Sequence, residues 1–266
     1  MTPSGKLLAY KNAQDAEVMR ETLALGLKRW KALPASERAA GAVEVPSLGK
    51  VDANYTRTPP EGGLILRAST RILDREKDKF VRGTCDSPGG DRPARDHVWL
   101  TKGEWQALVP AEPRVGQTVP MPSAVTRRLA RFHLLDNTRG EPATWTADDV
   151  RKADLIWTVT AVTPEEVTME ATGSALLTDD ADPKKAKRGY DAALRGLIRY
   201  DRAKKAVTRL DLVAVGDHWG HTTYTAGERP GRTPLGVSFE LTPGKDAADR
   251  VPPQAAREEA EYYKAR

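Results

Sequence analysis

The feature that most restricts the fold of this chain is a series of long β-strand candidates in its second half. Each candidate alternates apolar and polar residues, which is the period-two pattern of a strand with one buried face. The candidates are residues 155–162, 167–177, 189–200 and 206–215. Short loops separate the members of each pair, at 163–166 and at 201–205. The pattern therefore predicts two antiparallel hairpins.

Two more segments, residues 64–72 and 235–241, show the same alternation. Short helices are expected after Thr101, where Glu104 completes a capping box, and near Ser123. Helices placed early and hairpins placed late indicate an α+β fold with a β-rich antiparallel body. Two arrangements are open for the late strands, a small closed barrel and a strongly curved sheet.

The N-terminal segment combines a short strand candidate with an amphipathic helix. Residues 6–10 are mostly apolar and precede the helical pattern. Apolar residues then recur at spacings of four, four and three between Met19 and Trp30, which places them on one helical face. Pro34 is expected to end this helix.

The run from Gly5 to Ala9, followed by a helix that ends in Trp30, resembles the closing strand and helix of thioredoxin-like domains. The resemblance covers residues 5–33. It implies at most a remnant of such a domain. It implies no redox activity, because Cys85 is the single cysteine and no Cys-x-x-Cys motif is present.

Composition along the chain predicts four parts. Residues 34–62 are rich in proline, glycine and small side chains, which is typical of a linker or an extended wrap. The last residues hold charges of both signs and few large aliphatic side chains, which predicts a mobile tail or a solvated helix. The expected parts are a strand–helix piece (1–33), the linker (34–62), the β-rich body (63–242) and the tail (243–266).

The chain has no apolar run of about 18 residues, so a soluble protein without a membrane-spanning helix is expected. One cysteine excludes an intramolecular disulfide but does not fix the compartment. The N-terminus lacks the apolar stretch of a signal peptide, which favours the cytoplasm. A thioredoxin-like segment beside a sheet body instead favours an extracytoplasmic protein whose leader has been removed. Both settings stay open.

The four histidines suggest a metal site as one hypothesis. His218 and His221 flank Trp219 in a segment expected to be a loop at the sheet edge. Together with His97 and Cys85 they could form a first shell for zinc, copper or iron. A metal-dependent enzyme would then use metal-bound water as nucleophile, with Glu228 as general base. The alternative is that all four histidines are structural. Cys85 could also act as a nucleophile, but the adjacent Asp86 disfavours a thiolate.

A basic hairpin suggests a second site, for polyanions. The net charge of the chain is +5, and residues 184–209 hold ten basic and two acidic residues. The candidate binding residues are Arg195, Arg199, Lys204, Lys205 and Arg209. Such a face could bind phosphates or acidic sugars. Nucleic acid is disfavoured because few aromatic residues lie among the cations. The alternative is a solvated hairpin whose charges are balanced by nearby aspartates.

The long loop at residues 216–234 completes the candidates. Long loops on rigid sheets often carry function, and this one places polar side chains beside His218 and His221. The leading prediction is therefore a domain that binds an unknown ligand or protein partner near residues 216–234. A metal-dependent enzyme and a polyanion-binding module are the alternatives, and the sequence leaves open whether the protein is an enzyme.

Overall fold

The computed structural model describes residues 1–2, 4–13, 15–39, 41, 57–77, 79–83, 92–225, 229–258 and 262–264. The chain divides into two compact units, Met1–Asp52 and Ala53–Arg266. The division falls inside residues 34–62, the segment expected to be a linker. Each unit is described by itself below.

The first unit contains helix α1 (Ala16–Lys31) and the short helix α2 (Ala35–Arg38). The Asp15 side chain caps α1 by accepting hydrogen bonds from the backbone N–H groups of Glu17 and Val18. Residues 6–10, expected to be a strand, form no strand among the described residues. They run beside α1, where Arg29 Nη1 donates to the Leu8 carbonyl at 2.6 Å. The thioredoxin-like resemblance of this unit stays a prediction.

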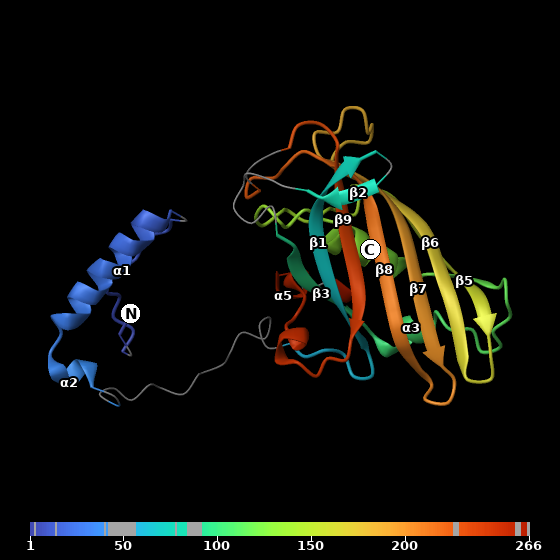
Figure 1. Cartoon of the computed structure of the whole chain (residues 1–266), viewed down its shortest axis with the longest axis horizontal. Helices are drawn as coiled ribbons and strands as arrows, with labels where there is room; N and C mark the ends of the chain where they lie inside the picture. The colour runs from blue at the N-terminus through green and yellow to red at the C-terminus, as the bar shows by residue number, and fades with distance from the viewer. Residues whose placement is uncertain are drawn as a thin grey trace. The chain divides into compact units, whose positions relative to one another are not determined.

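The second unit is built on one antiparallel sheet of nine strands (Figure 1). The strands are β1 (Leu64–Glu76), β2 (Lys79–Arg82), β3 (Ala94–Leu100), β4 (Thr118–Pro120), β5 (Val150–Val162), β6 (Glu166–Thr178), β7 (Gly189–Asp201), β8 (Ala206–Trp219) and β9 (Thr233–Thr242). Their order is β2-β1-β9-β8-β7-β6-β5-β4, and β3 also pairs with β1.

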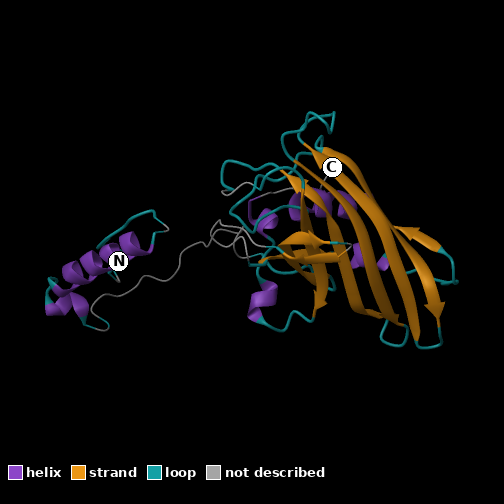
Figure 2. Cartoon of the chain, turned by 45° about the horizontal axis from the view of Figure 1, so that its top comes forward, coloured by secondary structure: helices purple, strands orange, loops and turns teal. Residues whose placement is uncertain are grey.

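The two predicted hairpins are confirmed as β5–β6 and β7–β8. Register follows the alternation of apolar residues, because a slip by one residue would turn every buried side chain toward solvent. On β7, Tyr190, Ala192 and Leu194 are buried while the residues between them are exposed. Figure 2 shows the short helices of this unit gathered on one side of the sheet.

The sheet is curved but does not close into a barrel. Its path ends at β4 on one side and at β2 and β3 on the other. Helix α4 (Ser123–His133) contacts both β5 and β3, which lie near opposite edges. The helix therefore packs against strands from both halves of the open sheet. Of the two arrangements open at the sequence level, the structure has the curved sheet.

The core lies on the inner face of this sheet. Helix α4 buries Val125, Leu129 and Ala130 there, and helix α3 (Lys102–Gln106) adds Trp105. The predicted helix start near Ser123 and the predicted capping box at Thr101 are both confirmed. No helix in the described part of the chain is long and apolar enough to cross a membrane.

The C-terminal segment packs on the body, although its composition predicts a mobile tail. It forms η1 (Ala247–Arg250), α5 (Gln254–Glu258) and η2 (Tyr262–Lys264). Gln254 N–H donates to Asp96 Oδ1 at 3.0 Å, which ties α5 to β3. Buried small residues of α5 and the ring of Tyr262 pack against Phe132 of α4. These contacts need few large aliphatic residues, which explains why composition does not predict them.

A buried group of polar side chains, in which His133 lies between Asp96 and Tyr262, joins this segment to the core. His133 Nδ1 lies 3.3 Å from Asp96 Oδ2, and His133 Nε2 lies 2.7 Å from the Tyr262 hydroxyl. Burial alone would raise the pKa of Asp96, but His133 and the Gln254 N–H hold that pKa below its ordinary value. An ionised Asp96 favours the proton on Nδ1, so Nε2 accepts the hydrogen bond of Tyr262.

We predict that Tyr262→Phe destabilises the body. The substitution leaves the ring in place but removes the donor for a buried imidazole nitrogen, which costs about 1–3 kcal/mol. Tyr263→Phe is the matched control, because the Tyr263 ring is only partly buried and its hydroxyl makes no hydrogen bond within the described residues. Urea unfolding of both variants measures the difference. Equal stabilities would show that the Tyr262 hydroxyl contributes nothing.

Candidate ligand pocket

One cavity of the body lies beneath the β7–β8 turn. There the segment after α3 crosses the ends of β6 and β7, where Val167 pairs with Tyr200. The cavity has a volume of about 320 Å³. Its lining residues are Trp105, Gln106, Val109, Pro110, Ala111, Pro113, Val167, Tyr200, Arg202 and Lys205. This volume is at the lower end of small-molecule pockets, which span roughly 300–1,000 Å³.

Helix α3 fixes the aromatic wall of the pocket. The side chain of Thr101 accepts a hydrogen bond from Glu104 N–H, and the Glu104 carboxylate accepts one from Thr101 N–H. The same carboxylate accepts a hydrogen bond of 2.7 Å from Nη2 of the fully buried Arg128 on α4. Trp105 Nε1 donates to the Gly62 carbonyl at 2.9 Å. The indole is therefore held by the helix cap and by its own hydrogen bond.

The β7–β8 turn supplies the cations. Asp201 Oδ1 accepts a hydrogen bond of 2.8 Å from Lys204 N–H, and its Oδ2 lies 2.9 Å from Lys204 Nζ. The turn ends at Lys205, whose φ of 50° is left-handed. Arg202 Nη1 donates to the Thr163 carbonyl in the neighbouring β5–β6 turn at 2.7 Å. Arg202 is thereby oriented while Nη2 stays available.

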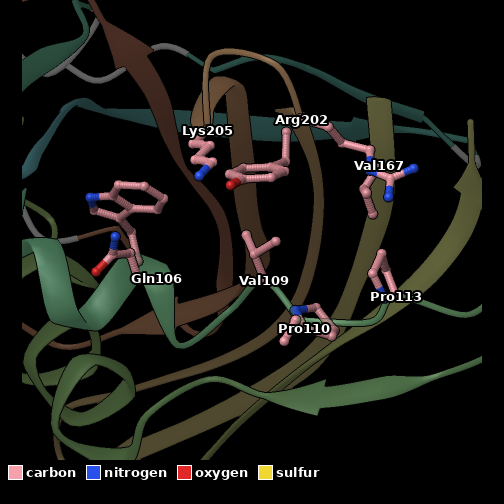
Figure 3. Close-up of a pocket in the computed structure, with 10 residues that line it drawn as sticks. Gln106, Val109, Pro110, Pro113, Val167, Arg202 and Lys205 are labelled. Carbon is pink, nitrogen blue, oxygen red and sulfur yellow. The ribbon is translucent and has the colours of Figure 1, made fainter. Parts of the chain in front are cut away.

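The pocket combines apolar walls with a few polar groups. Figure 3 shows Lys205 and Arg202 on the turn side, with Val109 and Pro110 on the opposite side. The polar groups are the Gln106 amide, the Tyr200 hydroxyl and the two cations. Apolar walls with a small number of placed polar groups are typical of binding sites for small molecules.

The candidate metal residues are not gathered at one place. Cys85 and Glu228 lie outside the described residues. His97 on β3 pairs with Arg67, Arg67 pairs with Glu240, and Glu240 pairs with Asp211 of β8. His218 lies seven residues further along β8, a separation of about 20 Å or more at the rise of a strand. Among the described residues, no three histidine, cysteine, aspartate or glutamate side chains are grouped to hold a metal ion.

His218 and His221 occupy different environments, although both were expected on a loop. Strand β8 continues to Trp219, so His218 is buried in the strand while His221 is exposed beyond it. Burial lowers the pKa of His218 to about 4, and the opposing charge of Asp136 only partly offsets this effect. A metal site using His218 and His221 with residues outside the described part stays a prediction.

The loop at residues 216–234 is tied down by its own neighbours. Arg139 pairs with Asp136 at 2.6 Å and donates to the Gly220 carbonyl at 3.4 Å. The guanidinium of Arg232 lies 3.9 Å from the centre of the Trp219 ring. The Trp219 ring and the guanidinium groups of Arg139 and Arg232 are therefore used in internal contacts. Binding near this loop stays a prediction.

The basic hairpin carries acidic partners on the same outer face. Arg199 lies 3.9 Å from Glu166 and Arg209 pairs with Asp211. Arg195 and Arg209 line a shallow groove of about 480 Å³ that Asp211 and Glu240 also line. The carboxylates beside these arginines reduce the positive charge of this face, which makes binding of a polyanion here less favourable. Lys205 differs from the other candidates because it also lines the pocket on the inner side.

Sequence reasoning missed most of the pocket. Trp105 lies in the short helix expected after Thr101, and Tyr200 lies in the basic hairpin, but neither residue was a candidate for binding. The capping box before Trp105 was the available signal for a fixed indole. No local pattern shows that residues 105–113 cross the ends of β6 and β7. Comparisons of the chain with protein-family models, curated proteins and solved structures find no match.

The pKa of His218 predicts a loss of stability in mild acid. Between pH 6.5 and about 4, the unfolded chain binds a proton at this histidine and the folded chain does not. The free energy of unfolding therefore decreases as the pH falls through this window, by up to roughly 3 kcal/mol. His218→Gln should reduce the decrease measured by urea unfolding between pH 7 and pH 4.5.

His221→Gln is the control for this experiment, because His221 is exposed. His97, whose pKa is also lowered by burial, remains in both variants. The pKa of Asp136 is held below 3.8 by Arg139 against the effect of burial, so its carboxylate stays ionised in this range. An unchanged pH dependence in His218→Gln would contradict the assignment.

Proposed function

We propose that the β-rich body binds a small molecule in the pocket beneath the β7–β8 turn. The observation that carries the proposal is a cavity of about 320 Å³ whose indole and proline walls come from residues 105–113, whereas its cations come from the β7–β8 turn. This keeps the ligand-binding class of function predicted from the sequence. It moves the site from the 216–234 loop to the residues around Trp105 and Tyr200.

Three features support binding here. The walls are fixed, because α3 is tied to Arg128 and the turn is tied to Thr163. A pre-formed site loses less conformational freedom when a ligand binds. The Trp105 ring is mostly buried but lines the cavity, where it offers an apolar surface to a ligand.

A pocket-filling variant tests the proposal. We expect neutral bicyclic aromatic fragments, such as naphthalene-2-methanol, to bind the wild-type protein in saturation-transfer NMR. Val109→Trp should abolish this binding, because the half-buried Val109 lines the cavity and an indole would occupy it. The fold should be kept, since Val109 lies outside regular helix and strand.

Val115→Trp is the matched control. Val115 lies on the same segment and is 67% exposed, and it does not line the cavity. This variant should bind the fragments as the wild type does. Binding that survives unchanged in Val109→Trp, or the absence of any fragment binding to the wild type, would contradict the proposed site.

A further inference from the structure

The charges that line the pocket have one sign. Its lining residues include Arg202 and Lys205 but no aspartate or glutamate. Cations at the edge of an apolar site attract anions, and low-dielectric walls strengthen this field. The charge of the pocket therefore selects against cationic ligands.

The two lysines of the β7–β8 turn differ in their partners: Lys204 has a carboxylate partner, and Lys205 has none among the described residues. Lys204 forms an ion pair with Asp201 and does not line the pocket. Lys205, the next residue, pairs with no carboxylate among the described residues and lines the pocket. Arg202 uses Nη1 for the Thr163 carbonyl, so its other terminal nitrogen is the one that can meet a ligand. In Figure 3 the Arg202 side chain extends away from that of Lys205, so the partner of a single small anion is Lys205.

The wall away from the turn suits an apolar ring. Val109 and Pro110 are rigid or branched and carry no side-chain hydrogen-bonding groups, while Trp105 adds an aromatic surface. A cavity of about 320 Å³ holds roughly ten water volumes. One or two fused rings with a short anionic substituent fit such a space, whereas a long acyl chain would not.

We propose that the ligand is a compact ring-bearing anion, a carboxylate or a phosphate monoester, with its ring near Trp105 and its anion at Lys205. This inference rests on the proposed function of the pocket. It adds the class of ligand, which the shape of the cavity alone does not define.

A series of probes on one ring tests the charge preference. Naphthalene-2-carboxylate and 2-naphthyl phosphate carry the two forms of the anion, naphthalene-2-methanol is neutral, and 2-naphthylmethylammonium is cationic. We expect the better anion to bind about fivefold more tightly than the neutral probe, and the cation to bind most weakly. The advantage should shrink as salt rises from 20 to 500 mM, because screening weakens exposed charge pairs. The two anionic probes show which form is preferred.

Lys205→Gln should remove most of the anion advantage and leave the affinity for naphthalene-2-methanol unchanged. Lys204→Gln is the matched control, because it removes the same formal charge one residue away. It should keep the advantage. Equal affinity for anion and neutral probe in the wild type would overturn the anionic class and leave the pocket intact. No binding of any probe would overturn both proposals. An equal loss in both variants would mean a general charge effect and would overturn the role of Lys205.

Discussion

The rest of the structure depends on covering the inner face of a long-stranded sheet. A strand of 13 residues such as β7 spans about 43 Å. Helix α4 has 11 residues and spans about 16 Å. One helix of this length cannot cover such strands from end to end. The chain around α3 covers part of the remaining area with Trp105 and Leu108, while the C-terminal segment packs against Phe132 of α4. Tight contacts such as Arg128 with Glu104 hold these pieces in place.

The pocket lies where this covering changes from helix to loop. At the end of β7, Tyr200 is only half-buried, and the segment after α3 crosses above it without filling the space. The same end of the sheet carries the β7–β8 turn, so apolar walls and cations meet there. The Arg128–Glu104 and Arg202–Thr163 hydrogen bonds hold the segments around the pocket, and segments held in this way position binding residues more precisely than an unsupported loop. The proposed function therefore follows from the shortness of α4 as much as from any single side chain.

Much of the sheet could be predicted from the sequence, because its information is local. The alternation of apolar and polar residues predicted the two hairpins and the buried faces of β1 and β9. The capping box of Thr101 and Glu104 predicted the start of α3. Closure was not predictable, since it depends on α4 contacting β3 and β5 together. The packing of Tyr262 depends on His133, more than a hundred residues away. The position of His218 was missed because β8 runs on through a Gly-Asp-His-Trp sequence that locally favours a loop. The pocket is formed by three segments that lie far apart in the sequence, so no local pattern identifies it. Of its lining residues, only Lys205 was a predicted binding residue.

The outer edge of β5 has a consequence for association between molecules. Ile156, Trp157 and Thr158 of this strand pair with β4, which ends in Pro120, and Leu155 and Val159 form backbone hydrogen bonds with the residues that flank β4. The register of β5 with β6 shifts on both sides of that contact, between Val150 and Lys152 and again between Val159 and Ala161. Bulges of this kind twist an edge and interrupt its row of backbone donors and acceptors. The open sheet thus presents no long straight edge on this side for a strand of another chain to extend, which guards a large β-structure against edge-to-edge aggregation.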